Sequence, residues 1–428
     1  MTLHQSFVQH DITDCTKGQS LLSLQHARAV FLKDAQPISE TVSIGLNEAL
    51  FRITAADVVS DVSLPRFDNS AMDGFGICLD DLSTSFPKTL QLAGRALAGH
   101  SATGSCTSGS ALRVLTGSRV PTDVAAIIPQ EQVTIIGDTI LISSAPRCGA
   151  NIRRQGEDTL AGSVVVPKGI IVDARHIAML AAVGVTQIHA LRPIRIGLIS
   201  TGDELSDDSR DLSPNGIVDV NRPMLRSLLA SPMFDVTDLG ICRDDPSLLS
   251  QILKSAAERT DLIISSGGIS GSETDFLESA VLNAGGTYER LRVAIRPGKP
   301  IAKGRIGAME IVGLPGNPVS ALINFLIFAR PILFKKLGTA GAALSAVKAR
   351  CAVALPRHFN RSEFIPAQIG SINEFGEPIV RKLGSGSSAS LSPWITADGF
   401  ALVDAGVGSI EAGERLDFYP FRNAFSIS

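Results

Sequence analysis

The chain has 428 residues, a formal net charge of −3, 44% hydrophobic residues and 19% charged residues. This length predicts about two to four domains, and the composition is typical of a folded α/β protein rather than a disordered one. Six cysteines lie far apart with no C-x-x-C pair, and the seven histidines show no metal-ligand spacing. We therefore expect free thiols in a cytoplasmic protein.

The hydropathy pattern of the chain does not indicate a membrane protein. The N-terminal segment MTLHQSFVQHDITD carries acids and lacks the apolar run of a secretory signal. The most apolar window, residues 319–334, is interrupted by Asn324, Arg330 and Pro331, which predicts a core helix instead of a membrane span. We expect neither a membrane nor a nucleic acid as a partner.

The first segments predict a mixed helical domain. Apolar spacing indicates helices over residues 23–35 and 41–56. Residues 164–185 add a strand, a turn and a helix. Together they predict an N-terminal domain formed by residues 20–62 plus 146–190.

Between its two parts we expect a β-rich insertion domain over residues 63–145, because short alternating segments there are bounded by Gly, Ser and Pro. Its first stretch, FDNSAMDGFGI, contains turn formers, yet Asp73 lies in an apolar neighbourhood. This makes Asp73 a candidate functional acid, with a plain Asx-turn before a strand as the alternative. Thr116 and Gly117 form a turn at one strand end.

From residue 191 to residue 340, apolar strands alternate with helical segments, which predicts a parallel sheet with crossover helices. In open α/β sheets, ligands bind outside the carboxyl ends of the strands. Asn221 is expected as the N-cap of the helix after the first strand, or as a ligand. The residues expected to meet at the strand ends are Glu204, Asp244, Gly267, Gly268, Ser270 and Asp275.

The stretch 292–325 is the most distinctive in the chain. Its first fourteen residues hold five cations around a Pro-Gly turn, and a short buried strand, a tight loop and a helix follow. Asn317 or Ser320 is placed to cap that helix, whose N-terminus favours anions. A solvated basic face is the alternative. The candidate binding residues are Arg292, Arg296, Lys299, Pro315, Asn317, Pro318 and Ser320.

Carboxylates beside cations suit a phosphorylated ligand held with a hard divalent cation such as Mg²⁺. The candidate acids are Asp73, Glu204, Asp244 and Asp275, although any single one could instead cap a helix. The chain lacks G-x-x-x-x-G-K-[ST] and lacks G-x-G-x-x-G before a helix, which argues against a P-loop ATPase and a dinucleotide dehydrogenase. Residues 341–428 return to short alternating strands and predict a small β-barrel or sandwich.

Several longer motifs occur in the order found in molybdopterin molybdenumtransferases, the molybdenum insertases that include the E-domain of gephyrin. The match runs from about residue 20 to the end and comprises FDNSAMDG, RVLTG, NIRRQGED, STGDEL, NRPML, SSGGIS with Asp275, AIRPGKP and GLPGNPVSA. The resemblance implies a multi-domain homodimer in the cytoplasm, with a molybdopterin-binding α/β domain. It also implies a transferase of molybdenum cofactor biosynthesis, which inserts molybdate into adenylated molybdopterin with Mg²⁺-dependent release of AMP.

The resemblance further implies a cleft lined by the positions matching Asp73, Thr116, Glu204, Asp244, Asp275, Arg292, Arg296, Pro315 and Pro318. Glu204, Asp244 and Asp275 would hold Mg²⁺ or position the attacking water, and Asp73 with Thr116 would complete the cleft from the partner subunit. A molybdopterin adenylyltransferase and apo-molybdoenzymes would be its protein partners. Two alternatives stay open: a non-catalytic cofactor carrier or scaffold, and the preceding molybdopterin adenylylation.

The chain departs from the family pattern at five places. Ser272 stands where the family has glycine, and Arg292 and Arg296 stand where lysines are common, so that a planar fork replaces a point charge. Residues 386–388 replace a Gln-Gly-Ser signature, and Asp398 replaces an asparagine. These departures would alter substrate choice or efficiency.

Overall fold

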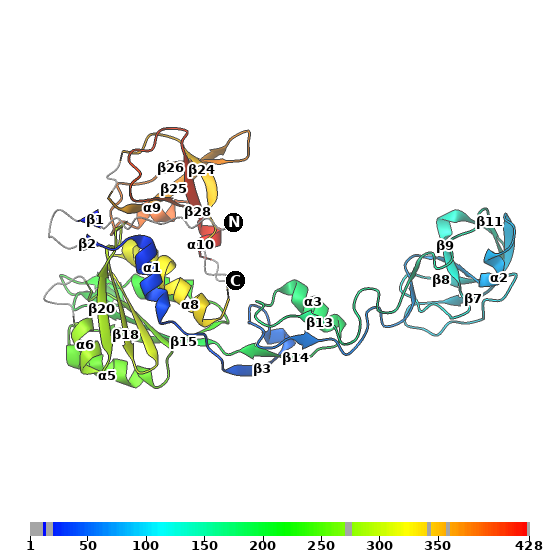
Figure 1. Ribbon diagram of the computed structural model, residues 1–428, viewed down its shortest axis with the longest axis horizontal. Coiled ribbons are helices and arrows are strands. Elements are labelled where there is room, and N and C mark those ends of the chain that lie inside the picture. Colours follow the sequence, from blue (N-terminus) through cyan, green and yellow to red (C-terminus); the bar gives the residue numbers. More distant parts are fainter. Residues whose placement is uncertain (1–11, 14–19, 270–275, 340–343, 357–359, 426–428) are drawn as a thin grey trace, which may run out of the picture. The chain divides into compact units, whose positions relative to one another are not determined.

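The computed structural model describes residues 12–13, 20–269, 276–339, 344–356 and 360–425. The chain divides into two compact units, each with its own core (Figure 1). The first unit contains residues up to 42, residues 51–53 and residues 191–428, and the second contains residues 43–50 and 54–190. The five described cysteines are free.

A six-stranded sheet forms the centre of the first unit. Its order is β18-β15-β19-β23-β22-β20. The bounds are β15 (Ile194–Thr201), β18 (Phe234–Cys242), β19 (Leu262–Ser266), β20 (Thr287–Arg292), β22 (Pro300–Ile306) and β23 (Met309–Leu314). The predicted parallel sheet is confirmed for β18, β15, β19 and β23, and two antiparallel strands extend it.

Helices cover both faces of this sheet (Figure 1). On one face, α5 and α6 pack together over a core that includes Leu253, Ile263 and Val281. On the other, α4 contacts α7, and α1 contacts α8. The bounds are α1 (Leu24–Lys33), α4 (Asn221–Leu228), α5 (Pro246–Ala257), α6 (Leu277–Asn283), α7 (Pro318–Asn324) and α8 (Arg330–Lys336), with a π-helical turn at Phe325–Ala329.

The continuous helix Pro318–Lys336 is long and apolar enough to cross a membrane, but 89% of its apolar window is buried inside the protein. That burial is what a core helix shows, because its apolar side chains pack against the sheet and α1.

A closed five-stranded barrel completes the first unit. Strands β25-β26-β24-β28-β27 pair in that order, and β27 pairs back with β25. The bounds are β24 (Val347–Cys351), β25 (Ser362–Ile372), β26 (Pro378–Lys382), β27 (Gly399–Val403) and β28 (Arg415–Pro420), with α9 (Ser392–Ile395) and α10 (Phe421–Ala424). The short strand β21 (Ile295–Arg296) joins β25 in parallel, so the basic turn is attached to the barrel.

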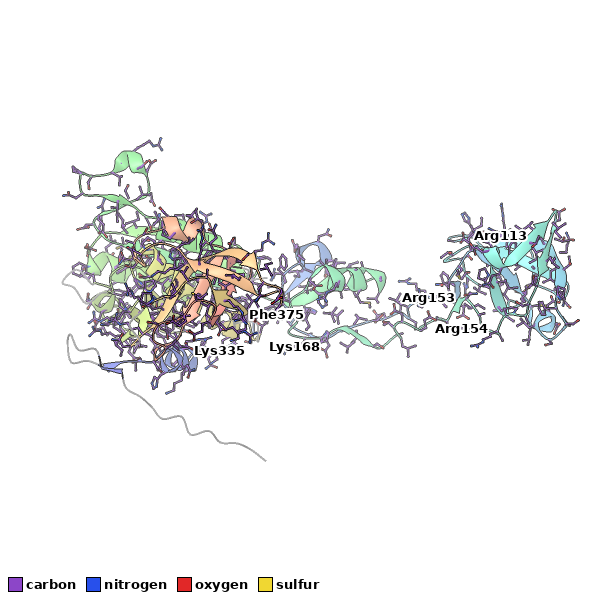
Figure 2. The ribbon with its side chains drawn as sticks, turned by 90° about the horizontal axis from the view of Figure 1, so that it is seen from above. Arg113, Arg153, Arg154, Lys168, Lys335 and Phe375 are labelled. Atoms are coloured by element: carbon purple, nitrogen blue, oxygen red, sulfur yellow. The ribbon has the colours of Figure 1, made fainter. Side chains whose placement is uncertain are left out.

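The second unit contains a β-rich domain, as the sequence predicts. Its largest sheet has the order β10-β11-β7-β8-β6-β9. The bounds are β6 (Gly74–Ile77), β7 (Lys88–Ala96), β8 (Ser110–Val114), β9 (Ala126–Pro129), β10 (Val133–Ile136) and β11 (Thr139–Ile142). Arg153 and Arg154 lie outside this sheet (Figure 2) and form ion pairs with Glu157 at 2.7 Å and Asp68 at 2.6 Å.

The second helix predicted near the N-terminus is wrong. The first, residues 23–35, is confirmed as α1, where the Ser23 side chain accepts the backbone N–H of His26. Residues 41–56 instead form β3 (Thr41–Gly45) and a single 3₁₀ turn (Leu46–Glu48). Thr41, Val42 and Ile44 are β-branched and favour a strand, which pairs with β14 (Gln187–Leu191).

The helix predicted later in the same region is confirmed as α3 (Ala174–Ala182), preceded by β13 (Val164–Val166). The remaining short elements are β1 (Ile12–Thr13), β2 (Ser20–Leu21), β4 (Val58–Val59), β5 (Asn69–Ser70), α2 (Leu79–Leu82), β12 (Ile152–Arg153), β16 (Leu205–Ser206) and β17 (Ile217–Val218), with 3₁₀ turns at Gln130–Gln132 and Ser209–Asp211.

Candidate functional site

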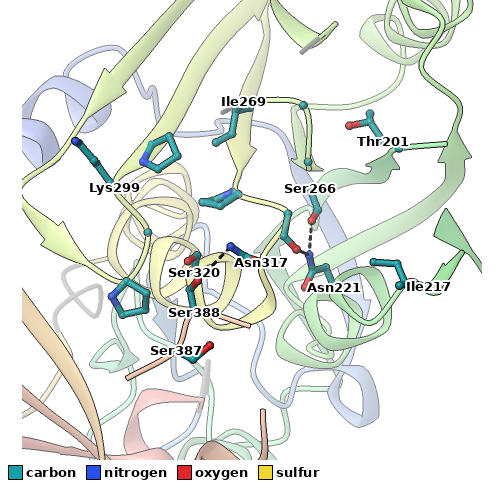
Figure 3. Close-up of a pocket in the computed structure, with 18 of the residues that line it drawn as sticks. Thr201, Ile217, Asn221, Ser266, Ile269, Lys299, Asn317, Ser320, Ser387 and Ser388 are labelled. Carbon is teal, nitrogen blue, oxygen red and sulfur yellow. Dashed lines mark hydrogen bonds between the residues drawn. The ribbon is translucent and has the colours of Figure 1, made fainter. Parts of the chain in front are cut away.

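A cavity of about 760 Å³ lies at the carboxyl ends of β15, β19 and β23 (Figure 3). The turn 296–300 and the barrel loop 386–388 line it from the other side. Nine of the predicted site residues line this one cavity: Glu204, Asp244, Gly267, Gly268, Arg296, Lys299, Pro315, Asn317 and Ser320. Residues more than a hundred positions apart thus meet at the edge of the sheet where ligands are expected.

The other predicted residues lie elsewhere. Arg292 ends β20 opposite Pro300, and Pro318 is the first residue of α7; neither is among the described residues that line the cavity. Asp73 and Thr116 belong to the second unit. Ser270 and Asp275, together with Ser272, lie outside the described residues.

The floor of the cavity requires glycine. Gly267 and Gly268 have φ values of 94° and 67°, a region that L side chains rarely adopt. A Cβ on Gly267 would lie 2.5 Å from the carbonyl oxygen of Thr201, and one on Gly268 would lie 2.9 Å from its hydroxyl. The β19 loop therefore packs directly against the end of β15, and any side chain would push the two strand ends apart.

Two acids face the cavity from the ends of β15 and β18. The carboxylate of Glu204 lies over the backbone of Gly202, where a Cβ would come within 2.6 Å of it. The backbone N–H of Asp244 donates to Asp203 at 3.1 Å, which holds the loop after β18. Asp245, next in sequence, accepts the backbone N–H groups of the first turn of α5. Asp245 is thus a helix cap, whereas Asp244 lines the cavity.

Cations line the opposite wall. Arg296 has a side chain that is 51% exposed, and its Nη1 lies 3.6 Å from Oε1 of Glu363. Lys299 and Arg361 line the same cavity. A cis peptide bond precedes Pro297, and Asn324 of α7 donates to the carbonyl of Gly298 at 3.0 Å. The turn that carries Arg296 and Lys299 is therefore fixed to α7.

Sequence reasoning missed the barrel's contribution to this cavity. Arg361, Ser387 and Ser388 come from the C-terminal domain and line it. Asn317 is the N-cap residue of α7, but its side chain makes no capping bond and instead donates to Oγ of Ser388 at 3.1 Å. Residues 386–388 depart from the family signature, and this was the one signal in the sequence that pointed to the loop. A comparison of motifs could not show that the loop contacts the start of α7.

The prediction that Asn221 is the N-cap of its helix is wrong, because Val220 takes that position. Asn221 is the first residue of α4, and the carboxylate of Asp219 accepts its backbone N–H, so Asp219 takes the capping role. Asp398, the other departure, accepts the backbone N–H of Ile369 at 2.8 Å. An acceptor oxygen is all that this contact needs, so aspartate serves there as well as asparagine.

Asp73 and Thr116 form a pair in the second unit. Oδ1 of Asp73 accepts the backbone N–H of Thr116 at 2.8 Å and its hydroxyl at 2.7 Å. These two hydrogen bonds lower the pKa of the Asp73 carboxyl below its ordinary value. Asp73 and Thr116 are thus in direct contact, with Asp73 held ionised.

The donor set of the cavity suits a hard cation. Within the described part of the chain, no group of three or more His, Cys, Asp or Glu residues could hold a metal ion. Glu204 and Asp244 nevertheless place two carboxylates in the cavity. Mg²⁺ keeps several waters and is commonly bound by one or two carboxylates together with substrate phosphates, so these two residues fit it as candidate ligands.

Comparisons with known proteins find family matches over three consecutive parts of the chain. Residues 22–184 match the MoeA N-terminal region (domain I and II), residues 197–335 a probable molybdopterin binding domain, and residues 348–421 the MoeA C-terminal region (domain IV). The molybdopterin molybdenumtransferase of Haemophilus influenzae is 35% identical over 411 residues, covering 94% of this chain and 99% of that protein. Molybdopterin molybdenumtransferase 2 of Mycobacterium tuberculosis is 32% identical, covering 92% and 98%.

A comparison with solved structures also finds a MoeA protein. The crystal structure of the molybdopterin biosynthesis MoeA protein from Pyrococcus horikoshii OT3 superposes with a TM-score of 0.78 at 27% identity. It covers 94% of this chain and 100% of that chain. The likeness therefore extends over the sheet domain, the barrel and the second unit alike.

Proposed function

This chain belongs to the MoeA family of molybdopterin molybdenumtransferases, and from that membership we propose that it inserts molybdate into adenylated molybdopterin with Mg²⁺-dependent release of AMP. It is a transferase of molybdenum cofactor biosynthesis. The observation that carries the proposal is the cavity of the first unit, where carboxylates and cations from distant parts of the chain line one volume.

The cationic wall would bind the anionic parts of the substrates. Arg296, Lys299 and Arg361 suit the pyrophosphate of adenylated molybdopterin and the molybdate oxyanion, because guanidinium groups bind such oxygens bidentately. The loop before α7 adds Asn317 and Ser320, close to a helix N-terminus that favours negative charge. Together these groups would stabilise the charge that develops as the pyrophosphate is split.

The acidic wall would complete the site. Glu204 and Asp244, together with Asp275, would hold Mg²⁺, which when bound neutralises charge on the phosphate oxygens. The carboxylates themselves would orient the attacking water toward the phosphorus, because a carboxylate accepts a hydrogen bond from the O–H of that water. The Gly267-Gly268 turn lets the backbone approach the ligand without a side chain between them.

The second unit would contribute through a homodimer. Asp73 and Thr116 are paired and polar but lie outside the unit that contains the cavity. We propose that these two residues reach the cavity of the partner subunit in a cytoplasmic homodimer, and that a molybdopterin adenylyltransferase supplies the substrate. Apo-molybdoenzymes would receive the product.

A substitution at Glu204 tests the catalytic role of the acidic wall. Glu204→Gln keeps the shape of the side chain but removes its charge, so we expect adenylated molybdopterin still to bind while AMP release falls by about a hundredfold. Binding would be measured by titration calorimetry and AMP by chromatography. Glu258→Gln, on an exposed residue after α5, is the matched control and should behave as the wild type.

Near-normal AMP release by Glu204→Gln would remove Glu204 from the mechanism. Tight binding without AMP release by the wild-type protein would instead indicate a cofactor carrier. ATP-dependent adenylylation of molybdopterin would indicate the preceding step of the pathway.

A further inference from the structure

Asn221 occupies an unusual position beside the cavity. It is only 5% exposed, it begins α4, and its backbone N–H donates to Oδ1 of Asp219 at 3.0 Å. The start of the helix is therefore held by Asp219, and the side chain of Asn221 is available for another role. A buried amide normally satisfies its polar groups with specific partners.

The carboxamide of Asn221 donates both of its N–H groups to two different loops (Figure 3). One donates to Oγ of Ser266 at the end of β19, and the other to the carbonyl of Gly316 after β23, both at 2.7 Å. Both loops line the cavity. They also adjoin each other, since a Cβ on Gly316 would lie 3.8 Å from Cα of Gly267.

We propose that Asn221 is a positioning residue for the reaction, which fixes the distance between the Ser266–Gly268 loop and the Pro315–Asn317 loop. The inference rests on the proposed function, because these two loops are assigned there to contact the ligand. Asn221 lines the cavity, but both of its side-chain N–H groups bind the two loops, so its role is to position them. It joins these two backbone segments together with the hydrogen bond from the backbone N–H of Gly267 to the carbonyl of Leu314 at 3.0 Å.

The chemistry of the two acceptors requires an amide. The carbonyl of Gly316 can only accept a hydrogen bond, and it receives one from a planar group that simultaneously serves Ser266. Oδ1 of Asn221 is buried and has no hydrogen-bond partner in the described chain, so the NH₂ group makes these contacts. A carboxylate of the same shape could still accept from Ser266, but it would oppose the carbonyl of Gly316.

That difference allows a test by pH. In Asn221→Asp, the new carboxyl opposes Gly316 when ionised, whereas its protonated form has one O–H that can donate to the carbonyl. Burial and the adjacent carboxylate of Asp219 both raise the pKa of such a group, so its protonation is accessible in mildly acidic buffer. Arg222, also buried at the start of α4, is the neighbouring cation.

The experiment compares AMP release by full-length wild type, Asn221→Asp, Asn221→Ala and Asn283→Asp between about pH 5.5 and 8. Asn283 is exposed at the end of α6 and controls for an added carboxylate. We expect Asn221→Asp to lose at least about tenfold of the wild-type rate at pH 8 and to recover part of that ratio as the pH falls. Asn221→Ala should lose activity equally at every pH, and Asn283→Asp should follow the wild type.

Several outcomes would overturn the inference. These are an unchanged rate for Asn221→Asp, a loss that does not depend on pH, or an Asn221→Asp protein that is unfolded by circular dichroism throughout the range, which would make Asn221 a purely structural residue. If the wild-type protein itself releases no AMP, the proposed function fails instead. In that case, binding of adenylated molybdopterin to the same four proteins decides whether the two loops are still positioned by Asn221.

Discussion

Asp73 shows how one residue's charge is set by its neighbours. Its Oδ1 accepts two hydrogen bonds from Thr116, which lower the pKa of the carboxyl. A depressed pKa in the folded state means that the pair stabilises the fold above the ordinary carboxyl pKa of about 3.9. This contribution is lost as the pH falls through the folded-state pKa, so Asp73 stays ionised at every pH at which the protein would work.

Thr116→Val removes the hydroxyl donor but keeps the backbone N–H. The pKa of the Asp73 carboxyl should therefore rise toward its ordinary value without reaching it, which carboxyl carbon chemical shifts in an NMR titration would report. Thr122→Val, at an exposed threonine of the same domain, should leave that pKa unchanged. An unchanged pKa in Thr116→Val would mean that the hydroxyl does not hold the carboxylate.

Single residues also show how much of the site could be predicted from the sequence. Asp73 was predicted because an acid in an apolar turn is unusual. The strand-end rule predicted Glu204, Asp244 and the glycine turn, and all three line the cavity. The role of Asn221 could not be predicted, since its two partners lie 45 and 95 positions away in the chain. Such a cross-link exists only after the loops have been brought together by the sheet.

At the scale of elements, the strands β15 and β19 are joined at both ends. The glycine turn packs on Thr201 at their carboxyl ends, and Asp261 joins their amino ends. Its carboxylate contacts Arg192 at 2.6 Å and Arg195 at 2.8 Å, and it accepts the backbone N–H of Arg195. These groups lower the pKa of the Asp261 carboxyl, although burial alone would raise it.

Asp261→Asn should lower the free energy of unfolding at pH 7 by about 2 kcal/mol, the order expected for hydrogen bonds to a charged group. Because the folded-state pKa of Asp261 is depressed, the difference from wild type should shrink as the pH falls below about 4. Urea unfolding at several pH values would measure it. Asp235→Asn, at an exposed position of β18, is the control. A loss that stays constant with pH would show that the ion pairs are not its cause.

The elements themselves were predictable where their pattern is strong. The buried runs of β15, β19 and β23 have few polar residues because helices cover both faces. The antiparallel addition of β22 and β20 was not visible, since a strand's direction depends on its connections rather than on its own sequence. The helix predicted over residues 41–56 is wrong because the β-branched residues of β3 favour a strand more strongly than the apolar spacing favours a helix.

At the scale of the whole molecule, the sheet and the barrel meet through the basic turn. Strand β21 carries Arg296 and pairs with β25 of the barrel. One short segment therefore connects the cationic wall of the cavity to both the sheet and the barrel. Repeated strand and helix patterns predicted a sheet domain followed by a barrel. They could not predict that Arg361 and Ser388 of the barrel line the same cavity as Glu204, because that requires the path of β21.

The central claim is that this cavity converts adenylated molybdopterin and molybdate into molybdenum cofactor. The most direct measurement incubates the purified protein with both substrates, with and without Mg²⁺, and follows AMP release together with activation of an apo-molybdoenzyme. We predict that AMP is released and the apo-enzyme activated only when Mg²⁺ and molybdate are both present. Tight binding of adenylated molybdopterin with neither AMP release nor activation would contradict the claim.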